Sequence, residues 1–486
     1  MKKVNKSSGY LLLQIIVFGA VAVMIIVGLV TYATSTVRLG RRAVASEQAF
    51  QIAEAGLEYY RWHLAHAPSD FTNGTGLPGP YVKNFYDKGG AFLGNFTLTI
   101  TPPSLGSTLV TIRSDGRVTS DASIRRSVLA KLSIPSFANY AVVTNYSFMR
   151  FGEGTEVYGP IHSNAGLRFD GLAHNLVTSA SSTYDDPDHS GGNEFAVHTH
   201  VNPPPASGVN DTFRAAEAPP SAVPNRSDIF VAGRSFPAPL INFGFITNDL
   251  TQMKTDAQSG GRYFASSTVL GYKVVLKNND TFDLYRVNSL TAAPSKCTNV
   301  GNQTLWSTWS VNAASLVGNY GFPANGLLFL DDNIWVEGTI NTARLTINAA
   351  HVPDNNLALR RSLTVNNNLL YTNYNGQDAL ALIGQNDVNV GLVSSSTLRI
   401  DGALVAQFGR IGRYYYESDC NPYHTRSSIT LYGTLVTAKR YGFAYVDGTG
   451  YTTRTIIYDA YLLYTPPPFF PETIPFYDVI SWKEVE

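Results

Sequence analysis

The chain has 486 residues, too many for one small domain, and roughly 150 residues per domain predicts about three. Only 15% of the residues are charged, and 36 Lys and Arg balance 36 Asp and Glu, which argues against a protein built around nucleic-acid binding. A hydrophobic content of 44% excludes a mostly disordered chain, and two cysteines exclude a disulfide scaffold or a four-cysteine zinc site.

An apolar segment follows the short basic start of the chain. From Leu11 to Val30 the only strongly polar side chain is Gln14. Twenty helical residues rise about 30 Å, the thickness of the hydrocarbon core of a bilayer. A cleaved secretory signal has a shorter apolar stretch and a small-x-small cleavage site, and no convincing site follows here. Because Lys2, Lys3 and Lys6 hold the start in the cytoplasm, we expect a single-pass membrane protein with its bulk outside.

The helical pattern continues beyond the apolar segment. The stretch 36–67 contains neither proline nor a turn cluster, and Pro68 closes it. We predict one helix from Tyr10 to about Ala67, about 58 residues and roughly 87 Å long. An ordinary membrane anchor followed by a stalk is the alternative. Apolar residues at mostly three- and four-residue intervals mark one stripe on its outer half: Ala43, Phe50, Ala53, Leu57, Tyr60 and Leu64.

Specific residues at the start resemble a known family. The leader ends in Ser8-Gly9 and is followed by Tyr10 and three leucines, which resembles the class III signal of type IV pilins and pseudopilins. In that family a membrane peptidase cuts after the glycine and N-methylates the new first residue, so the resemblance implies processing between Gly9 and Tyr10. The segment 53–58, AEAGLE, is similar to the N-terminal pattern of PilX-like minor pilins.

One residue departs from the family pattern. The family usually has Glu at the fifth mature position, where this chain has Gln14. The resemblance implies that the Glu pairs with the amino terminus of a neighbouring subunit, offsetting the cost of burying both charges. An amide still accepts a hydrogen bond from that amine but supplies no charge. We therefore expect a tip or low-abundance subunit, and a tolerated polar residue in a membrane anchor is the alternative.

Strands follow the helix. The segments 96–101 and 109–113 alternate apolar and polar residues, and 127–132 returns as a third strand. Ser114-Asp115-Gly116 is typical of a turn. A long helix followed by a small antiparallel sheet is the layout that the resemblance to pilins implies. Such a sheet can bury the apolar stripe of the helix.

An internal repeat occupies much of the remaining chain. Six segments share the pattern apolar-x-apolar-x-Gly-x-apolar, with Asn367 replacing glycine in one of them because Asn also adopts a left-handed backbone readily. Strand, bend and strand predict one rung of a parallel β-helix or similar solenoid. Antiparallel hairpins with glycine bulges are the alternative. The turn residues of the six copies are Gly159, Gly171, Gly338, Asn367, Gly402 and Gly433.

The stretch between the second and third copies lacks the repeat pattern and has a different composition. It contains proline-rich linkers, a short helix candidate at 249–257, and strand candidates at 273–276 and 281–285. We therefore predict an α+β protein with a long N-terminal helix, a small antiparallel sheet and a solenoid-like domain that carries an insertion. The expected domains are a leader 1–9, a helix 10–67 (membrane-spanning over 10–32), an antiparallel β region 68–140, a solenoid-like domain 141–180 plus 326–486, and an insertion 181–325.

Acidic residues and histidines concentrate within sixteen positions of the expected insertion. Carboxylates and a His-x-His pair suit a divalent cation if the loop folds back. The spacing matches neither an EF-hand nor a zincin motif, so we expect a structural or solvated polar loop without a metal. The alternative is a cation site with the ligands Asp185, Asp186, Asp188, His198 and His200, and His189 and Glu194 belong to the same run.

Other chemistry has few candidates. Cys297 and Cys420 lie outside the membrane on this topology, and the sequence leaves a disulfide and two free thiols equally open. Solenoids host polysaccharide lyases and hydrolases, for which Asp331, Asp332 and Glu337 are the carboxylate candidates, although Asp331 and Asp332 also suit a strand-entry turn. No nucleophile elbow, phosphate loop or dinucleotide fingerprint occurs at a useful position. We expect neither catalytic residues nor a cofactor.

The resemblance implies a minor or tip subunit of a type IV pilus or related filament, with an adhesive or assembly role. Its implied partners are other pilin subunits through the N-terminal helix, a prepilin peptidase, a motor ATPase and an assembly platform. The implied location is the cytoplasmic (inner) membrane before assembly and an extracellular pilus afterwards, without a nucleic-acid partner. The alternatives are a permanently anchored surface adhesin and a surface carbohydrate-active enzyme on a β-helix.

Overall fold

The computed structural model describes residues 8–103, 107–145, 147–298, 303 and 305–485. The chain divides into two compact units, which we describe separately. The helix–sheet unit comprises 1–102, 110–133 and 476–486, and the parallel β unit comprises 103–109 and 134–475. Residues 1–7 of the expected leader, with its three lysines, lie outside the described residues.

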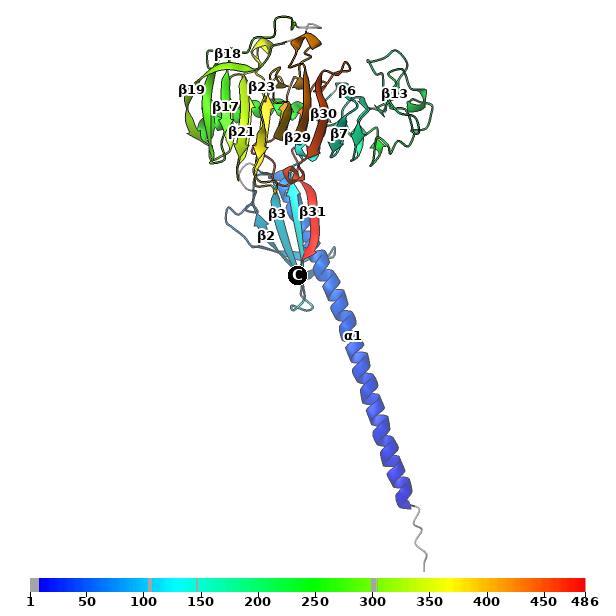
Figure 1. Ribbon diagram of the computed structural model, residues 1–486. Helices are drawn as coiled ribbons and strands as arrows, with labels where there is room; N and C mark the ends of the chain where they lie inside the picture. The colour runs from blue at the N-terminus through cyan, green and yellow to red at the C-terminus, as the bar shows by residue number, and fades with distance from the viewer. Residues whose placement is uncertain (1–7, 104–106, 146, 299–302, 304, 486) are drawn as a thin grey trace, which may run out of the picture. The chain divides into compact units, whose positions relative to one another are not determined.

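The helix–sheet unit combines one long helix with one antiparallel sheet (Figure 1). The helix begins at Ser8 and ends at His66, which confirms the predicted single helix. The strand order β1-β2-β3-β4-β31 is antiparallel throughout. The elements are α1 (Ser8–His66), β1 (Tyr81–Tyr86), β2 (Phe92–Thr101), β3 (Val110–Val118), β4 (Arg125–Ser133) and β31 (Asp478–Val485).

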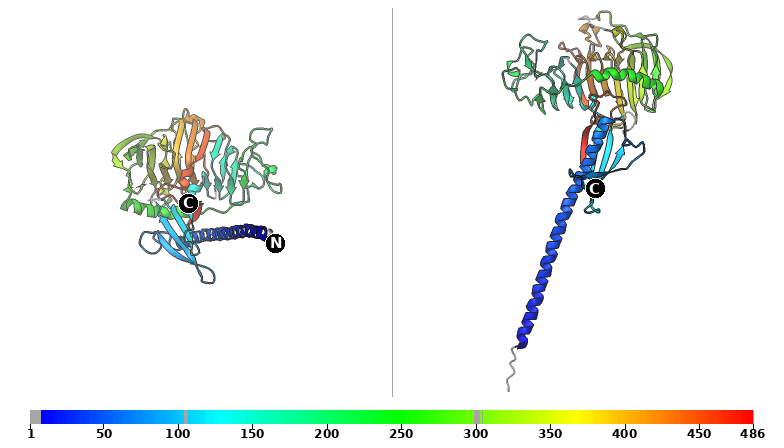
Figure 2. Two further views of the ribbon diagram at one scale, coloured as in Figure 1. Left: turned by 90° about the horizontal axis from the view of Figure 1, so that it is seen from below. Right: turned by 180° about the vertical axis from the view of Figure 1, so that it is seen from behind.

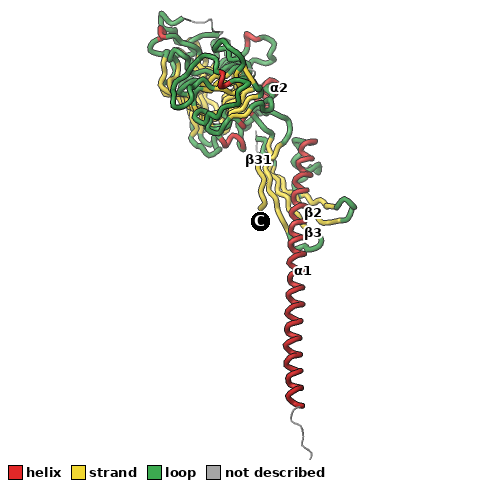
Figure 3. The backbone as a smooth tube through the Cα atoms, turned by 90° about the vertical axis from the view of Figure 1, so that its right-hand side faces the viewer, coloured by secondary structure: helices red, strands yellow, loops and turns green. Residues whose placement is uncertain are grey.

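Only the outer half of α1 packs against the sheet (Figure 3). Its buried side chains recur every three or four residues, as one face of a helix requires. Two members of the predicted stripe differ, because Ala43 is exposed and Phe50 is half-buried. The buried face instead begins at Ala45 and consists of Ala45, Ala49, Ile52, Ala53, Leu57, Tyr60 and Leu64.

The C-terminus supplies the fifth strand of this sheet. β31 pairs with β4, with Trp482 opposite Ala130. The Trp482 ring also lies edge-on to Phe50 of α1, with 6.0 Å between ring centroids. We expected the whole of 326–486 in the solenoid-like domain, and this boundary differs because strand pairing over such a distance leaves no local signal in the sequence.

The predicted turn at Ser114-Asp115-Gly116 is wrong, because these residues lie inside β3. Gly116 is opposite Phe96 in β2 and Arg126 in β4. A Cβ atom at Gly116 would lie 2.5 Å from the backbone nitrogen of Ala53 and closer still to the Ala49 carbonyl oxygen. The glycine therefore allows the helix backbone to rest directly on the strand, which is another common reason for a glycine within a strand.

The parallel β unit contains most of the chain. Its first part precedes α2 and holds short strands joined by long loops. Its strands are β5 (Val142–Thr144), β6 (Met149–Phe151), β7 (Thr155–Tyr158), β8 (Ile161–Ser163), β9 (Leu167–Phe169), β10 (Leu172–Ala173), β11 (Val177–Ser179), β12 (Thr183–Tyr184), β13 (Glu194–Phe195), β14 (Val197–His198) and β15 (Arg234–Ser235).

The second part begins with α2 and has longer strands. Its elements are α2 (Gly244–Ser259), β16 (Arg262–Phe264), β17 (Tyr272–Leu276), β18 (Thr281–Leu290), β19 (Val311–Gly321), β20 (Leu327–Leu330), β21 (Ile334–Ile340), β22 (Arg344–Ala349), β23 (Leu363–Thr364), β24 (Leu369–Tyr371), β25 (Ala379–Gly384), β26 (Val388–Val390), β27 (Thr397–Ala406), β28 (Ile411–Arg413), β29 (Thr425–Thr437) and β30 (Gly450–Tyr458).

The chain enters this stack of parallel strands in the middle. β5 and β7 pair in parallel with β29 and β30, which come some 290 residues later. From there β8, β11 and β15 extend the stack in one direction. The segment with α2 then crosses the unit to its far end, where β16 and β17 start the strands that return to the middle (Figure 2).

The expected insertion contributes strands to the parallel β unit. We expected 181–325 as an insertion, yet β15, β16 and β17 pair in parallel with β11, β20 and β21 and belong to the same sheet. β18 and β19 continue from β17 as an antiparallel extension. The proline-rich runs at 202–207 and 218–224 lie in the connection between β14 and β15, before the crossing segment.

The repeat is in register where its strands are longest. Gly402 of β27 lies directly opposite Gly433 of β29, and both have positive φ angles, 148° and 147°. This backbone conformation favours glycine. The assignment of Asn367 is wrong: it is not among the residues with positive φ, and Gly338 pairs with Leu369 instead, two residues further on.

Candidate functional site

The residues expected at the processing site lie at the start of α1. Gly9 belongs to its first helical residues, and Tyr10 and Gln14 are exposed. Every side chain from Tyr10 to Val44 is exposed in the helix–sheet unit. Among the described residues, α1 is the one helix that is long and apolar enough to cross a membrane.

Cys297 and Cys420 form a disulfide across 123 residues of sequence. Cys297 lies in the loop after β18, and Cys420 ends a short 3-10 helix, Ser418–Cys420. Both are buried among aromatic side chains, including Trp309, Trp335 and Tyr416. The bridge therefore links the connection after β18 to the connection after β28.

The carboxylate candidates for glycan chemistry are each held by a neighbour. Asp331 Oδ1 lies 2.7 Å from His351 Nδ1, and Asp331 Oδ2 accepts from Lys254 Nζ at 3.1 Å. Asp332 Oδ2 accepts from the backbone nitrogen of Ser267 at 2.7 Å. Glu337 forms an ion pair of 2.7 Å with Lys273. Asp331 and Asp332 follow the end of β20 and Glu337 lies within β21, and these contacts give the three carboxylates structural roles.

The acidic and histidine run folds into a hairpin at one end of the parallel β unit. β12 and β13 pair antiparallel, with Tyr184 opposite Glu194. β14 then pairs in parallel with β9, with His198 opposite Arg168. The hairpin folds residues 185–193 back over β14, so side chains fourteen positions apart meet.

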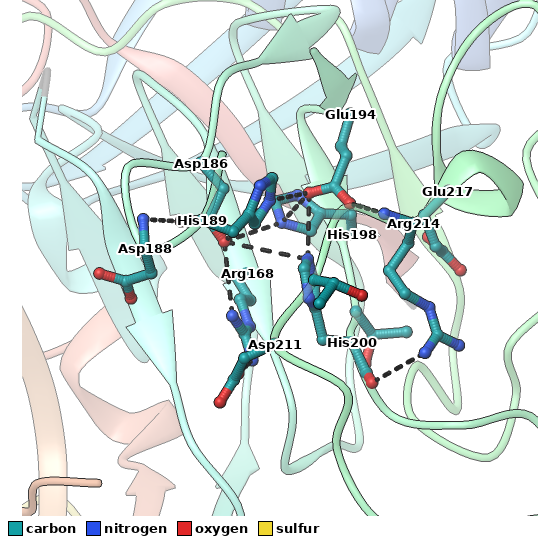
Figure 4. A network of polar contacts seen from close by, with 12 residues as sticks. Arg168, Asp186, Asp188, His189, Glu194, His198, His200, Asp211, Arg214 and Glu217 are labelled. Atoms are coloured by element: carbon teal, nitrogen blue, oxygen red, sulfur yellow. Dashed lines mark hydrogen bonds and ion pairs between the residues drawn. The ribbon is translucent and has the colours of Figure 1, made fainter. Parts of the chain in front are cut away.

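Three histidine rings and two carboxylates converge there (Figure 4). Glu194 Oε2 lies 3.0 Å from His189 Nε2, 3.1 Å from His198 Nε2 and 3.0 Å from His200 Nε2. Asp186 Oδ2 lies 3.5 to 3.9 Å from the same three nitrogens. We call this set the histidine–carboxylate cluster: Asp186, His189, Glu194, His198 and His200.

The histidine–carboxylate cluster is buried. Four of its five residues are 0% exposed, and the His189 side chain is 3% exposed. These five side chains are therefore not solvated, whereas Asp185, Asp188, Gly191 and Gly192 of the same segment are exposed. Among the described residues, Asp186 Oδ2 and His198 Nε2 are buried without a hydrogen-bond partner.

Hydrogen bonds from backbone groups around the cluster orient its side chains. His198 Nδ1 lies 2.9 Å from the Phe195 carbonyl oxygen, and His200 Nδ1 lies 2.8 Å from the Asn210 carbonyl oxygen. Backbone amides donate to the outer carboxylate oxygens, from Arg214 to Glu194 at 2.7 Å and from Asp188 to Asp186 at 2.9 Å. Each of these four groups is therefore held from outside while its other ring nitrogen or oxygen points inward.

Both buried carboxylates have a pKa below the ordinary value. Burial alone would raise the pKa of Glu194, but the hydrogen bond with His200, the nearby His198 and the Arg214 amide outweigh it and lower the pKa to about 2. Burial opposes the same change at Asp186, whose pKa also lies below its ordinary value because of His198, the Asp188 amide and Arg168. At both carboxylates these neighbours therefore outweigh the effect of burial.

The structure brings together only part of the alternative ligand set. Asp186, His198 and His200 converge, whereas Asp185 is exposed. Asp188 points away and pairs with Arg440, 2.9 Å between Nη2 and Oδ2, and with Arg150 at 3.2 Å. His189 and Glu194 complete the set instead. Their place in the set depends on the register of β12 with β13, in which Tyr184 lies opposite Glu194 and residues 185–193 form the connecting loop.

No protein-family model matches the sequence, and no curated protein matches it. Among solved structures, the crystal structure of the competence-associated pilin ComZ from Thermus thermophilus is similar with a TM-score of 0.31 and 14% sequence identity. The match covers 91% of this chain and 97% of that chain.

Proposed function

We propose that the chain is a pilin-like subunit of a type IV pilus or related filament. The observation that carries this proposal is the continuity of α1, which is bare and apolar over one half and packed on an antiparallel sheet over the other. An exposed apolar helix needs an apolar environment both before and after assembly. A bilayer supplies it before assembly, and the helices of other subunits supply it in a filament.

The length of the exposed part of α1 is consistent with both a bilayer and a filament of packed helices. The apolar stretch from Leu11 to Val30 matches the bilayer core at about 30 Å. The helix remains exposed for fourteen more residues, to Val44, before its first buried side chain at Ala45. A simple anchor needs no such continuous extension, whereas a filament core built from packed helices uses it.

Two features favour a minor or tip position. Gln14 supplies no charge to pair with the amino terminus of a neighbour, which weakens one contact that a repeating shaft would use at every subunit. The parallel β unit also adds residues 134–475 to the helix–sheet unit. A unit of this size on every subunit would crowd its neighbours along a repeating shaft. On this proposal the parallel β unit, which we infer to be a solenoid, is the part presented outside the cell.

The partners follow from the same proposal. A prepilin peptidase would remove the leader after Gly9 and methylate Tyr10, and an assembly platform with its motor ATPase would extract the subunit from the cytoplasmic membrane. A permanently anchored surface adhesin is the second candidate, because it would keep the same helix in the bilayer.

The mature N-terminus distinguishes the two candidates. We would express the chain with its native secretion system and sequence the N-terminal peptide by mass spectrometry. A pilin-like subunit starts at N-methylated Tyr10, and Gly9→Val blocks this processing, whereas the matched control Gly19→Val keeps the leader site and is processed normally. An intact leader on the wild-type chain would contradict the proposal. So would the absence of the protein from sheared filaments.

A further inference from the structure

We propose that the histidine–carboxylate cluster is a binding site for one first-row transition-metal dication, with Asp186, His189, Glu194, His198 and His200 as ligands. The site is independent of the filament proposal, since all five residues lie in the parallel β unit. Its role is structural: the metal ties the hairpin of β12 and β13 to β14.

The outer hydrogen bonds determine which ring nitrogens face inward with a lone pair. A carbonyl oxygen only accepts, so Nδ1 of His198 carries a proton for Phe195, and Nδ1 of His200 carries one for Asn210. In the neutral ring the other nitrogen, Nε2, is then an acceptor. Metal-binding histidines in proteins usually donate their outer N–H to a carbonyl or carboxylate in this way.

These inward lone pairs face an acceptor-only carboxylate. Nε2 of both rings lies 3.0–3.1 Å from Glu194 Oε2, and His189 Nε2 approaches the same oxygen at 3.0 Å. Two acceptors at this distance repel unless a proton or a cation lies between them. Three nitrogens around one oxygen would need three protons directed at a single atom.

Positive charges on the rings would lie close to one another. Ring centroids lie 5.3 Å apart for His198 and His200, and 5.1 Å apart for His189 and His200, so imidazolium ions would repel at short range inside the protein. The buried Arg168 guanidinium adds a further positive charge 3.6 Å from Asp186. A dication held between the rings would instead be attracted by the carboxylates of both Glu194 and Asp186.

The spacing of the donor atoms suits a metal ion. Ligand bonds of about 2.0–2.2 Å place neighbouring donor atoms about 3.0–3.6 Å apart around one ion. The donor atoms of Asp186, His189, Glu194 and His200 all lie within 4.8 Å of one another. Asp186 Oδ2 and His198 Nε2, buried without hydrogen-bond partners among the described residues, point into the same space.

The donor set selects the class of metal. Three imidazoles favour zinc and its first-row neighbours over Mg²⁺ and Ca²⁺, which prefer oxygen ligands throughout. The burial of all five side chains leaves no open face, which is typical of structural rather than catalytic metal sites. We therefore infer a zinc-type structural site.

Metal content of the full-length chain tests the inference. We would purify the chain in detergent through a tag without histidine, remove metals with a chelator, and titrate with Co²⁺ and Zn²⁺. We expect about one equivalent bound, a cobalt visible spectrum, and a zinc X-ray absorption edge with imidazole scatterers. Failure of the stripped wild-type chain to bind either ion, or an absorption signal without nitrogen scatterers, would overturn the proposal.

Variants locate the site. The double variant His198→Gln/His200→Gln should weaken zinc binding by about 100-fold or more, since loss of a group that only orients a ligand already costs about 10–100-fold and this variant removes two ligands. The matched control His174→Gln/His351→Gln changes two half-buried histidines of the same unit, paired with Glu156 and Asp331, and should bind as the wild type does. Equal binding by both double variants would refute the assignment even if the wild type binds metal.

Discussion

Gly116→Ala tests how closely α1 rests on the sheet. The added methyl group would lie 2.5 Å from the backbone nitrogen of Ala53 and 3.1 Å from its Cα, with the Ala49 carbonyl oxygen closer still. These are backbone atoms of a helix, so no side chain can rotate away to make room. The helix and the strand must separate.

The size of the effect follows from this geometry. An ordinary contact of about 3.4 Å requires a separation of about 1 Å, which forfeits a quarter to a half of the dispersion attraction across the interface. Overpacking of this kind costs typically about 1–3 kcal/mol, and removing a strand glycine returns about 0.5–1 kcal/mol. We expect a net loss of about 2 kcal/mol and a melting temperature lower by about 5–10 °C for the helix–sheet unit.

Hydrogen exchange with mass spectrometry measures this unit separately from the rest of the chain. Peptides from 45–66 should lose protection in Gly116→Ala, while peptides from the parallel β unit should not change. Gly40→Ala is the control, because nothing lies within 4 Å of its added methyl group and a helical alanine is favourable. Unchanged protection and melting in Gly116→Ala, or an equal loss in the control, would refute the close packing.

Three other predictions concern stability. Hydrogen bonds from Thr72 lower the pKa of Asp70 to about 2, so this carboxylate stabilises the fold above about pH 4 and loses the effect as the pH falls through 2. Asp70→Ala should lower the melting temperature at pH 6 by the equivalent of about 1 kcal/mol and have no effect at pH 1.5; a difference that persists at the lower pH would count against this. The buried guanidinium of Arg413 donates to three carbonyl oxygens within 3.0 Å, and Arg413→Met should cost more than about 3 kcal/mol in denaturant unfolding, so a loss below 1 kcal/mol would contradict its role. Replacing both Cys297 and Cys420 by serine should cost about 2–5 kcal/mol, measured the same way with the reduced wild type for comparison, and a stability equal to the oxidised wild type would show the bridge to be dispensable.

Local patterns in the sequence were sufficient for the main elements. The three- and four-residue spacing along α1 and the alternation in β2 to β4 arise from contacts between near neighbours, so the pattern can be read without the fold. The same holds for the glycines of the strand repeat, whose positive φ angles in Gly402 and Gly433 are backbone requirements at single positions.

The tertiary structure decided what depends on distant segments meeting. β31 joins the small sheet and β30 pairs with β7, some 300 residues away, and hydrogen-bonded ladders of this kind depend on backbone groups that every residue has. Gly116 resembles a turn residue until the helix lies on it. His189 and Glu194 become part of one buried cluster only when the hairpin folds over β14, because the convergence of their donor atoms is a property of three-dimensional position and not of spacing along the chain.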